Sequence, residues 1–293
     1  MAAVALGVAA DRVLPEPPDE WHPVARFGSL MTGLEQCIWS DRVDVGAAYA
    51  LVGVAVGAFA GNLTRGTAGA TSTAVAGTEL RRVAAEIVDE LDAGGLEAAR
   101  RALPALVGRD PATLDEAGVA AAVIESVAEN TVDALVAPVF WAVVAGAPGA
   151  LAYRAVNTMD AMVGHRSDRY ERFGKVSAHL DDLANLIPSR LTAGLFALTS
   201  DGRSSEVLRA VRRDAGAHPS PNAGVAEAAM AGALGVELGG PLAYGARRED
   251  RPTLGDGPRP DAAAARRAIA IAERAENVLL ASLVLGAFLG CRR

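Results

Sequence analysis

Three carboxylates at regular spacing stand immediately before a long apolar run of the chain. Glu125, Glu129 and Asp133 follow one another at intervals of four residues, so a helix places them along one face. Like charges stacked in this way repel, so they need a cation such as Mg²⁺ or an arginine, or one of them must hold a proton. A solvated helix end is the alternative. Asn130 beside them and the apolar run directly after favour a functional site.

A second group of polar side chains, the densest in the sequence, follows that apolar run. It comprises Asn157, Asp160, His165, Arg166, Asp168, Arg169, Tyr170, Glu171, Arg172, Lys175, His179, Asp181, Asp182, Asn185 and Arg190. Arg166, Arg169 and Lys175 could hold phosphates. Asp181 and Asp182 could bind Mg²⁺ through oxygen. A charged loop beside a membrane explains the same composition equally well, so composition alone does not decide between the two interpretations.

The sequence contains no familiar signature of a zinc site or a phosphate loop. Its four histidines lie apart, and none forms an H-E-x-x-H pair. Gly174-Lys175 is followed by valine, so it is not a Walker A loop. Cys37 and Cys291 form no C-x-x-C motif, which favours a reducing, cytosol-facing location. A bound nucleotide would therefore need a different kind of cradle.

The composition favours a membrane protein over a soluble enzyme. Hydrophobic residues make up 51% of the 293 residues, and the mean hydropathy is +0.22. Three runs carry no charge: 45–61, 134–153 and 278–291. A membrane span needs about 20 apolar residues, which only the second run reaches, and the runs 1–10 and 191–198 are shorter still. Core helices of a soluble all-α protein are the alternative.

Helical signals fill most of the remaining sequence. An amphipathic helix is predicted at 79–91, ended by Gly94-Gly95, and Thr113 with Glu116 forms a capping box that opens a long helix towards Pro138. Pro138 and Pro148 predict a kink or two half-helices in the second apolar run. Helical stretches are also expected at 206–213 and 262–274, with a loop at 246–260 and no strands. We therefore predict an all-α fold, a single membrane domain over 1–293 with about four to five membrane-embedded helices plus amphipathic helices.

The charge balance excludes a nucleic-acid partner. The net charge is -7, and no basic stripe that could neutralise phosphates is present. Lys175 is the only lysine, so the positive charge comes from arginine, which clamps anions but does not titrate. The first ten residues are apolar without a preceding basic residue, unlike a cleavable signal peptide, and we expect them to be retained.

Several motifs, in order along nearly the whole chain, resemble the CobD/CbiB family of adenosylcobinamide-phosphate synthases. They are Asp11-Arg12, Pro15 to Pro18, Trp21 to Val24, Gly108-Arg109-Asp110, Glu125 to Thr131 with Asp133, Ala155 to Asp160, Gly164-His165-Arg166, Arg169-Tyr170, Phe173-Gly174, Leu180-Asp181-Asp182, Asn185, Ile187-Pro188 and His218 to Gly224. The sequence departs from the family at His179, where arginine is usual, and at Val225-Ala226, where a Trp-Pro pair is common.

The resemblance implies a multi-pass enzyme of the cell membrane with a cytoplasm-facing active site. Its implied reaction is an ATP- and Mg²⁺-dependent ligation of (R)-1-amino-2-propanol, or its O-phosphate, to a propionate carboxylate of adenosylcobyric acid. The implied partners are these substrates and the lipid bilayer. The resemblance leaves open whether the protein forms a homo-oligomer. A catalytically inactive membrane sensor or scaffold of the same fold is the rival interpretation. A transporter is disfavoured because the ionisable residues gather at the ends of the predicted spans.

Residue chemistry then suggests a role for each candidate. Catalytic roles are predicted for Glu125, Glu129 and His165. Metal ligation is predicted for Asp133, Asp181 and Asp182. The predicted substrate- or phosphate-binding residues are Arg109, Asn130, Asn157, Asp160, Arg166, Arg169 and Asn222.

Overall fold

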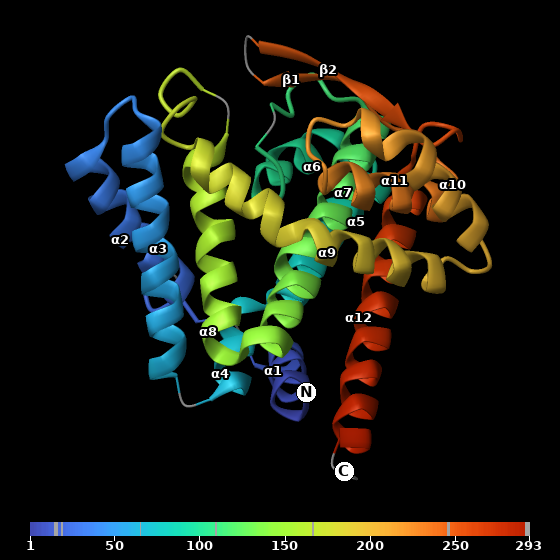
Figure 1. The fold of residues 1–293 in the computed structure, drawn as a ribbon. Helices are drawn as coiled ribbons and strands as arrows, with labels where there is room; N and C mark the ends of the chain where they lie inside the picture. The colour runs from blue at the N-terminus through green and yellow to red at the C-terminus, as the bar shows by residue number, and fades with distance from the viewer. Residues whose placement is uncertain are drawn as a thin grey trace. The chain divides into compact units, whose positions relative to one another are not determined.

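The chain is almost entirely helical in a computed structural model that describes residues 1–14, 17–18, 20–64, 66–108, 110–165, 167–244 and 247–290 (Figure 1). Its elements are α1 (Ala2–Val13), α2 (Pro23–Ile38), α3 (Val43–Leu63), α4 (Thr67–Ala74), α5 (Gly77–Asp92), α6 (Leu96–Ala102), α7 (Glu116–Thr131), α8 (Ala137–Met159), α9 (Lys175–Thr199), α10 (Ser204–Asp214), α11 (Ala223–Leu234), β1 (Leu238–Tyr244), β2 (Arg247–Leu254) and α12 (Ala262–Gly290). Two π-helical turns, Val132–Val136 and Asp160–Gly164, flank α8, and 3₁₀ turns occur at Leu103–Ala105 and Ala215–Ala217. The predicted helical class is confirmed.

The chain forms two compact units, each assembled from separate stretches of sequence. Unit 1 comprises Met1–Ala76, Asp133–Asn185 and Leu280–Arg293. Unit 2 comprises Gly77–Val132 and Leu186–Leu279. The single membrane domain expected from the sequence stays a prediction, and the two units are described separately below.

In unit 1, α3 lies side by side with α8 (Figure 1), and glycines allow the close approach. Gly53, Gly57 and Gly61 recur every four residues along α3. A Cβ atom at Gly57 would lie 2.6 Å from the carbonyl oxygen of Leu151, and one at Gly61 would lie 2.5 Å from that of Ala147. Such small-residue contacts are typical of helix pairs in membranes.

This packing predicts opposite effects for two glycine-to-alanine substitutions. Gly57→Ala is expected to lower the free energy of unfolding by about 1–3 kcal/mol, because the new methyl group overpacks the α3–α8 contact. Gly33→Ala in α2, where nothing lies within 4 Å of the added Cβ, is expected to raise it by about 0.5–1 kcal/mol through helix propensity. Thermal melting of the two variants in detergent measures the difference, and equal melting temperatures would contradict it.

The predicted kink in the second apolar run is confirmed. Ala145 has φ -130° and ψ 15°, and Gly146 has φ 65° and ψ -151°, two residues before Pro148. Proline cannot donate the backbone hydrogen bond of a regular helix, and glycine is the residue that adopts a positive φ without a steric penalty.

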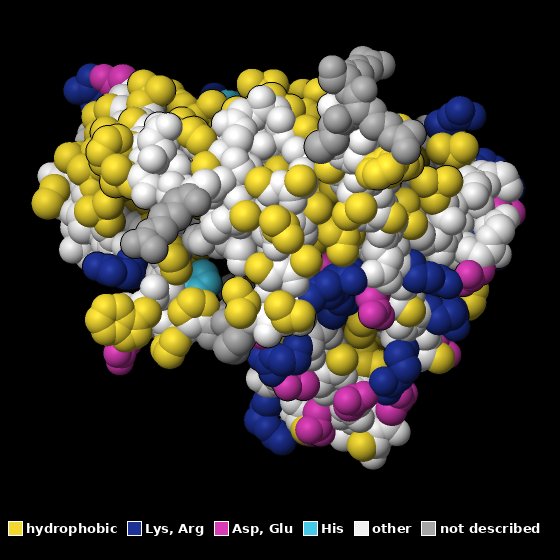
Figure 2. All heavy atoms as spheres, turned by 90° about the horizontal axis from the view of Figure 1, so that it is seen from below, with side chains coloured by type: hydrophobic (Ala, Val, Ile, Leu, Met, Phe, Trp, Pro, Cys, Tyr) yellow, Lys and Arg dark blue, Asp and Glu magenta, His cyan; other side chains and the backbone are white. Residues whose placement is uncertain are grey.

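Two helical segments of the described chain are long and apolar enough to cross a membrane. They are Val43–Leu63 and Glu116–Gly164, each with a mean hydropathy of 1.8 in its best window. Only 28% of the α3 window is buried, and Leu51, Phe59 and Leu63 are exposed, unlike a helix in a soluble core. Hydrophobic side chains cover much of the surface seen in Figure 2. The third predicted segment, 278–291, is not a separate helix but the end of α12, as far as Gly290.

In unit 2, α7 packs against α5 and α11, and α11 packs against α10. The predicted cap of α7 at Thr113 was wrong. The helix begins at Glu116, and the N-cap is Asp115, whose carboxylate accepts a hydrogen bond of 2.7 Å from the Gly118 N–H. Aspartate caps a helix at least as well as threonine. Asp115, which directly precedes the first turn, is therefore the N-cap in place of Thr113.

The prediction of no strands was wrong, and so was the loop prediction over 247–254, because β1 and β2 pair as an antiparallel hairpin. Residues 255–260 belong to no helix or strand, as predicted. Local periodicity missed it because strand formation depends on a partner across the turn. The base is sealed by the paired Leu238 and Leu254, both buried.

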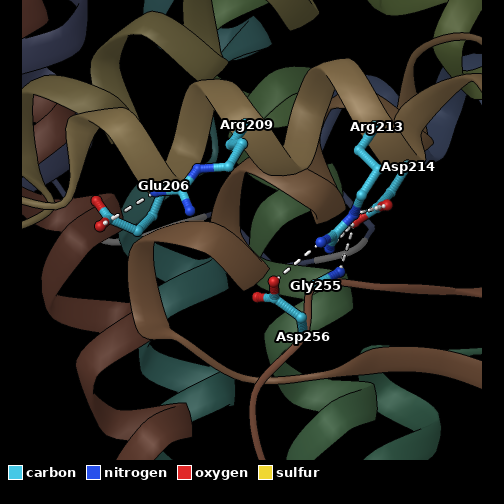
Figure 3. Close-up of polar contacts among 6 residues, drawn as sticks. All are labelled: Glu206, Arg209, Arg213, Asp214, Gly255 and Asp256. Carbon is cyan, nitrogen blue, oxygen red and sulfur yellow. Dashed lines mark hydrogen bonds and ion pairs between the residues drawn. The ribbon is translucent and has the colours of Figure 1, made fainter.

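The base of the hairpin is fixed to α10 through the polar network in Figure 3. The Gly255 N–H donates to Asp214 at 2.8 Å, and Arg213 bonds both Asp214, at 2.6 Å, and Asp256, at 2.9 Å. Gly255 has φ 85°, and a Cβ there would lie 2.2 Å from the Val236 carbonyl oxygen, so only glycine fits at this point.

Candidate functional site

A ring of polar side chains lies inside unit 1, built from three helical segments. Asp133 comes from the π-helical turn Val132–Val136, Tyr153 and Asn157 come from α8, and Asp181 and Asn185 come from α9. Tyr153 and Asn157 are four residues apart, and so are Asp181 and Asn185. Both members of each pair therefore lie on one face of their helix. π-helical turns inside longer helices are frequent at functional sites.

The indole of Trp141 on α8 helps to hold α9 in place, because its N–H donates to the Ala184 carbonyl at 3.1 Å. This contact lies next to Asn185 in sequence. The buried hydrophobic cluster of unit 1 includes Met159 and Phe173, which lie at the end of α8 and just before α9. The backbone around the ring is therefore packed and bonded on both helices.

Two amide groups lie between the two carboxylates of the ring. The Asn157 amide donates to Asp133 at 3.1 Å and to Asp181 at 3.4 Å. The Asn185 amide donates to Asp133 at 3.1 Å and to Asp181 at 3.0 Å. The Tyr153 hydroxyl donates to the amide oxygen of Asn185 at 2.9 Å. All four carboxylate oxygens of Asp133 and Asp181 thus accept hydrogen bonds inside the ring.

Burial shifts the proton affinity of one of these carboxylates. Desolvation raises the pKa of Asp181 to about 6, and the hydrogen bonds from Asn157 and Asn185, which lower it, offset only part of this effect. The neighbouring charge of Asp182 raises the pKa further. Perturbed carboxylates of this kind are typical of functional sites, although structural networks also produce them.

The ring brings together three predicted residues, Asp133, Asn157 and Asp181, with Asp182 half-buried beside them. The sequence predictions gave no role to Tyr153 or Asn185. The spacing Tyr153–Asn157 and Asp181–Asn185 is the signal that could have found them. Within the described residues, no three His, Cys, Asp or Glu side chains are grouped to hold a metal ion. The ring therefore offers two carboxylates, and the predicted metal role of Asp182 stays a prediction.

Arg169, predicted as a phosphate clamp, is engaged elsewhere in unit 1. Its Nε and Nη2 donate to Oε1 of Glu35 at 3.1 and 2.8 Å, and its guanidinium lies 4.5 Å from the centre of the Trp39 ring. Tyr170 donates to the same Glu35 oxygen at 3.0 Å. Glu35 is a buried carboxylate that the sequence did not single out, and it ties the segment before α9 to α2.

His165 and Asp160 lie at the two ends of the second π-helical region of unit 1. His165 is exposed, and its ring meets the Tyr170 ring edge-on at 5.0 Å. Asp160 is half-buried, and a Cβ at Gly164 would lie 1.9 Å from its Oδ1, so the turn packs closely on this carboxylate. Arg109 and Arg166 fall outside the described residues.

The other predicted residues belong to unit 2. Glu125 is 2% exposed, and its Oε1 accepts a hydrogen bond of 2.9 Å from the Gly239 N–H at the start of β1. The Asn130 amide donates to the Ser126 carbonyl at 2.9 Å, and Glu129 is half-buried. Asn222 accepts from Ser189 at 3.0 Å and from Arg190 at 2.8 Å.

Through this contact Glu125 anchors the start of β1 to α7, and two substitutions can test this role. Glu125→Gln keeps a carbonyl oxygen that can accept the Gly239 N–H, so we expect it to keep the wild-type melting temperature within a few degrees. Glu125→Ala is expected to lower the free energy of unfolding by about 1–3 kcal/mol, since it leaves a buried donor without its acceptor. Thermal melting in detergent compares the two, and equal destabilisation by Gln and Ala would contradict the anchor.

Comparison with known proteins identifies the family. The family model described as CobD/Cbib protein matches residues 4–272. A protein named Cobalamin biosynthesis protein CobD from Mycobacterium tuberculosis (strain H37Rv) is 48% identical over 282 residues, covering 92% of this chain and 90% of the relative. Proteins of the same name from Geobacter metallireducens (40% identical; 95% and 94% covered) and Rhodobacter capsulatus (53% identical; 65% and 61% covered) are also similar. No solved structure matches the chain. The chain therefore belongs to the CobD/CbiB family.

Proposed function

We propose that this protein acts in cobalamin biosynthesis and forms an amide bond between an aminopropanol unit and a corrinoid. The reaction is the ATP-dependent ligation of (R)-1-amino-2-propanol, or its O-phosphate, to the propionate carboxylate of adenosylcobyric acid, which gives adenosylcobinamide or its phosphate. The names of the relatives support the pathway. The hydrogen-bonded ring of Asp133, Tyr153, Asn157, Asp181 and Asn185, in which Tyr153 and Asn185 are buried and the other three half-buried, is the observation that supports a reaction centre in this chain.

The chemistry requires activation of the carboxylate, because a carboxylate does not condense with an amine unaided. In the proposed sequence the propionate oxygen attacks the γ-phosphorus of ATP, ADP leaves, and an acyl phosphate forms. The amine nitrogen then attacks the acyl carbon, phosphate leaves, and the nitrogen gives up a proton to a base. Glu125, Glu129 and His165 keep their predicted catalytic roles, which stay predictions for this last step.

The donor atoms of the ring suit Mg²⁺. This cation takes oxygen ligands and is commonly held by one or two carboxylates together with substrate phosphates and water, and the ring supplies the carboxylates of Asp133 and Asp181. When bound, Mg²⁺ would neutralise charge on the transferring phosphoryl group. Asn185, fixed by Tyr153, would orient Asp181.

We also infer that the protein is a multi-pass protein of the cell membrane with its active site facing the cytoplasm. The exposed apolar surface of α3 and the length of the Glu116–Gly164 segment support membrane insertion. Recovery of the full-length protein in a carbonate-washed membrane fraction is the expected result. Recovery in the soluble fraction without detergent would overturn this inference.

A product assay tests the proposed reaction. Detergent-purified protein is incubated with adenosylcobyric acid, ATP, Mg²⁺ and each of the two amines, and the corrinoid products are identified by mass. The proposal predicts a product heavier by the condensed amine with one of the two, and none when ATP is left out. No product with either amine would overturn it.

A further inference from the structure

A shallow cleft of about 350 Å³ lies in unit 2, where the turn between α9 and α10 meets α12. Its lining consists of Leu198, Thr199, Asp201, Gly202, Arg274, Asn277 and Val278. Binding pockets for small molecules span about 300–1,000 Å³, so this cleft is matched to a small ligand. None of the lining residues has a part in the site proposed above.

Two opposite charges face each other in this cleft. Arg274 bonds Asp201 through both terminal nitrogens, Nη1 to Oδ1 at 2.7 Å and Nη2 to Oδ2 at 2.9 Å. The side chains remain 42% and 75% exposed. An exposed ion pair contributes only about 0–1 kcal/mol to stability. Arg274 and Asp201 can therefore separate and each bind a ligand group instead, at little cost in free energy.

The backbone of the turn is unusual at the same place. Asp201 has φ 52° and is the only residue other than glycine with a positive φ in the described chain, and Gly202 follows with φ 87°. Aspartate tolerates this conformation better than most residues, but it still carries a cost. Strained residues of this kind cluster at ligand sites, which supports a binding role for the Asp201 carboxylate.

The cleft lies where α12 changes from charged to apolar. The last charged residue of the described helix is Glu276, and the stretch from Asn277 to Gly290 contains no charge. If the charge-free end of α12 enters a bilayer, as the sequence predicts for 278–291, Arg274 and Asn277 lie at the level of the lipid headgroups.

We propose that this cleft binds an aminoalkyl phosphate. The planar guanidinium of Arg274 forms paired hydrogen bonds with phosphate oxygens, the Asn277 amide adds a donor, and Asp201 holds the ammonium group. A phosphate without an amine meets the negative charge of Asp201, and an amine without a phosphate meets the positive charge of Arg274. The charge pattern therefore favours a small zwitterion over either half.

Two sources carry this chemistry: a free aminoalkyl phosphate, such as the phosphorylated amine of the proposed reaction, and the phosphoethanolamine headgroup of a phospholipid. Only the first source rests on the proposed function. If the ligation assay fails, binding of the headgroup remains a separate result.

Binding to the full-length protein in a phosphate-free detergent tests the proposal. Titration calorimetry with O-phosphoethanolamine is expected to show saturable binding, at least about tenfold weaker in Arg274→Gln through loss of one phosphate clamp. Asp201→Asn keeps a side chain that tolerates positive φ and is expected to weaken binding of O-phosphoethanolamine but not of inorganic phosphate. Arg266→Gln is the matched control. Arg266 lies on the same helix as Arg274 but pairs with Asp89 and Asp92 of α5, outside the cleft.

Competition then separates the sources. Displacement of O-phosphoethanolamine by aminopropanol O-phosphate but not by phosphatidylethanolamine in nanodiscs indicates a soluble ligand, and the reverse indicates the lipid. Phosphatidylglycerol, which has no amine, is expected not to compete. The proposal is overturned if O-phosphoethanolamine does not bind, if inorganic phosphate binds as tightly, or if Arg274→Gln and Arg266→Gln behave alike.

Discussion

Asp181→Asn is expected to reduce ATP-dependent product formation by about 100-fold or more while the protein stays folded. The substitution removes one of the two carboxylates of the ring, and loss of a single preorganised charged group in a reaction centre has effects of this order. The rate of corrinoid product formation per folded protein measures it. Asp41→Asn, an exposed carboxylate between α2 and α3, is the matched control and is expected to keep wild-type activity.

The same variant is expected to change stability little at neutral pH. The burial that raises the pKa of Asp181 to about 6 costs the ionised form about 3 kcal/mol relative to an ordinary aspartate. Asparagine at position 181 removes that cost. Its own amide N–H would, however, face the N–H of Asn157 or Asn185, and two opposed donors cost about 1–3 kcal/mol. A stability loss far beyond this balance would show that Asp181 acts mainly in the fold.

The pH dependence of stability has a definite sign. The pKa of Asp181 is higher in the folded protein than in the unfolded chain, so the folded state binds the extra proton. Its stabilising contribution is therefore fully present below about pH 4 and is lost as the pH rises through about 6. The melting temperature of the wild type minus that of Asp181→Asn is measured across this pH range in the presence of a chelator. This difference is expected to fall as the pH rises. A flat difference would contradict the shift.

The largest expected effect on stability comes from the ion pair of Arg81 and Glu276 in unit 2. Arg81, on α5, bonds Glu276, on α12, and the side chains are 15% and 0% exposed. Arg81→Met is expected to lower the free energy of unfolding by about 3–5 kcal/mol, because it removes the arginine charge that bonds this buried carboxylate. Thermal melting in detergent measures the loss.

A double variant separates the buried charge from simple loss of packing. Arg81→Met with Glu276→Met replaces both charges by apolar groups, and such replacements are often neutral or stabilising. Most of the lost stability is therefore expected to return. If the double variant melts as low as Arg81→Met alone, the side-chain shapes rather than the charges hold α5 against α12.

Helices were predictable from the sequence where their signal is local. The amphipathic spacing of Leu80, Ile87 and Leu91 predicts a helix at 79–91, and α5 runs from Gly77 to Asp92. Pro148 likewise predicts the break in α8. The hairpin was not predictable in this way, because its strands depend on pairing between Leu238 and Leu254 across the turn.

The site was only partly predictable for a related reason. The types of Asp133, Asn157 and Asp181 predict oxygen chemistry, but side chains from three segments meet only once those segments pack. Tyr153 looks like an apolar residue at the end of a charge-free run, and its contact with Asn185 depends on how α9 packs on α8. The partners of Glu125 and Arg169, a glycine N–H and a buried glutamate, lie 114 and 134 residues away in sequence.

The rate of ATP-dependent product formation by Asp133→Asn tests the central claim most directly. Asp133 accepts hydrogen bonds from both amides of the ring, so the ring as reaction centre predicts a loss of about 100-fold or more per folded protein. Asp214→Asn, which alters a carboxylate at the base of the hairpin, is expected to lose less than about tenfold. Wild-type activity in folded Asp133→Asn would contradict the assignment of the ring.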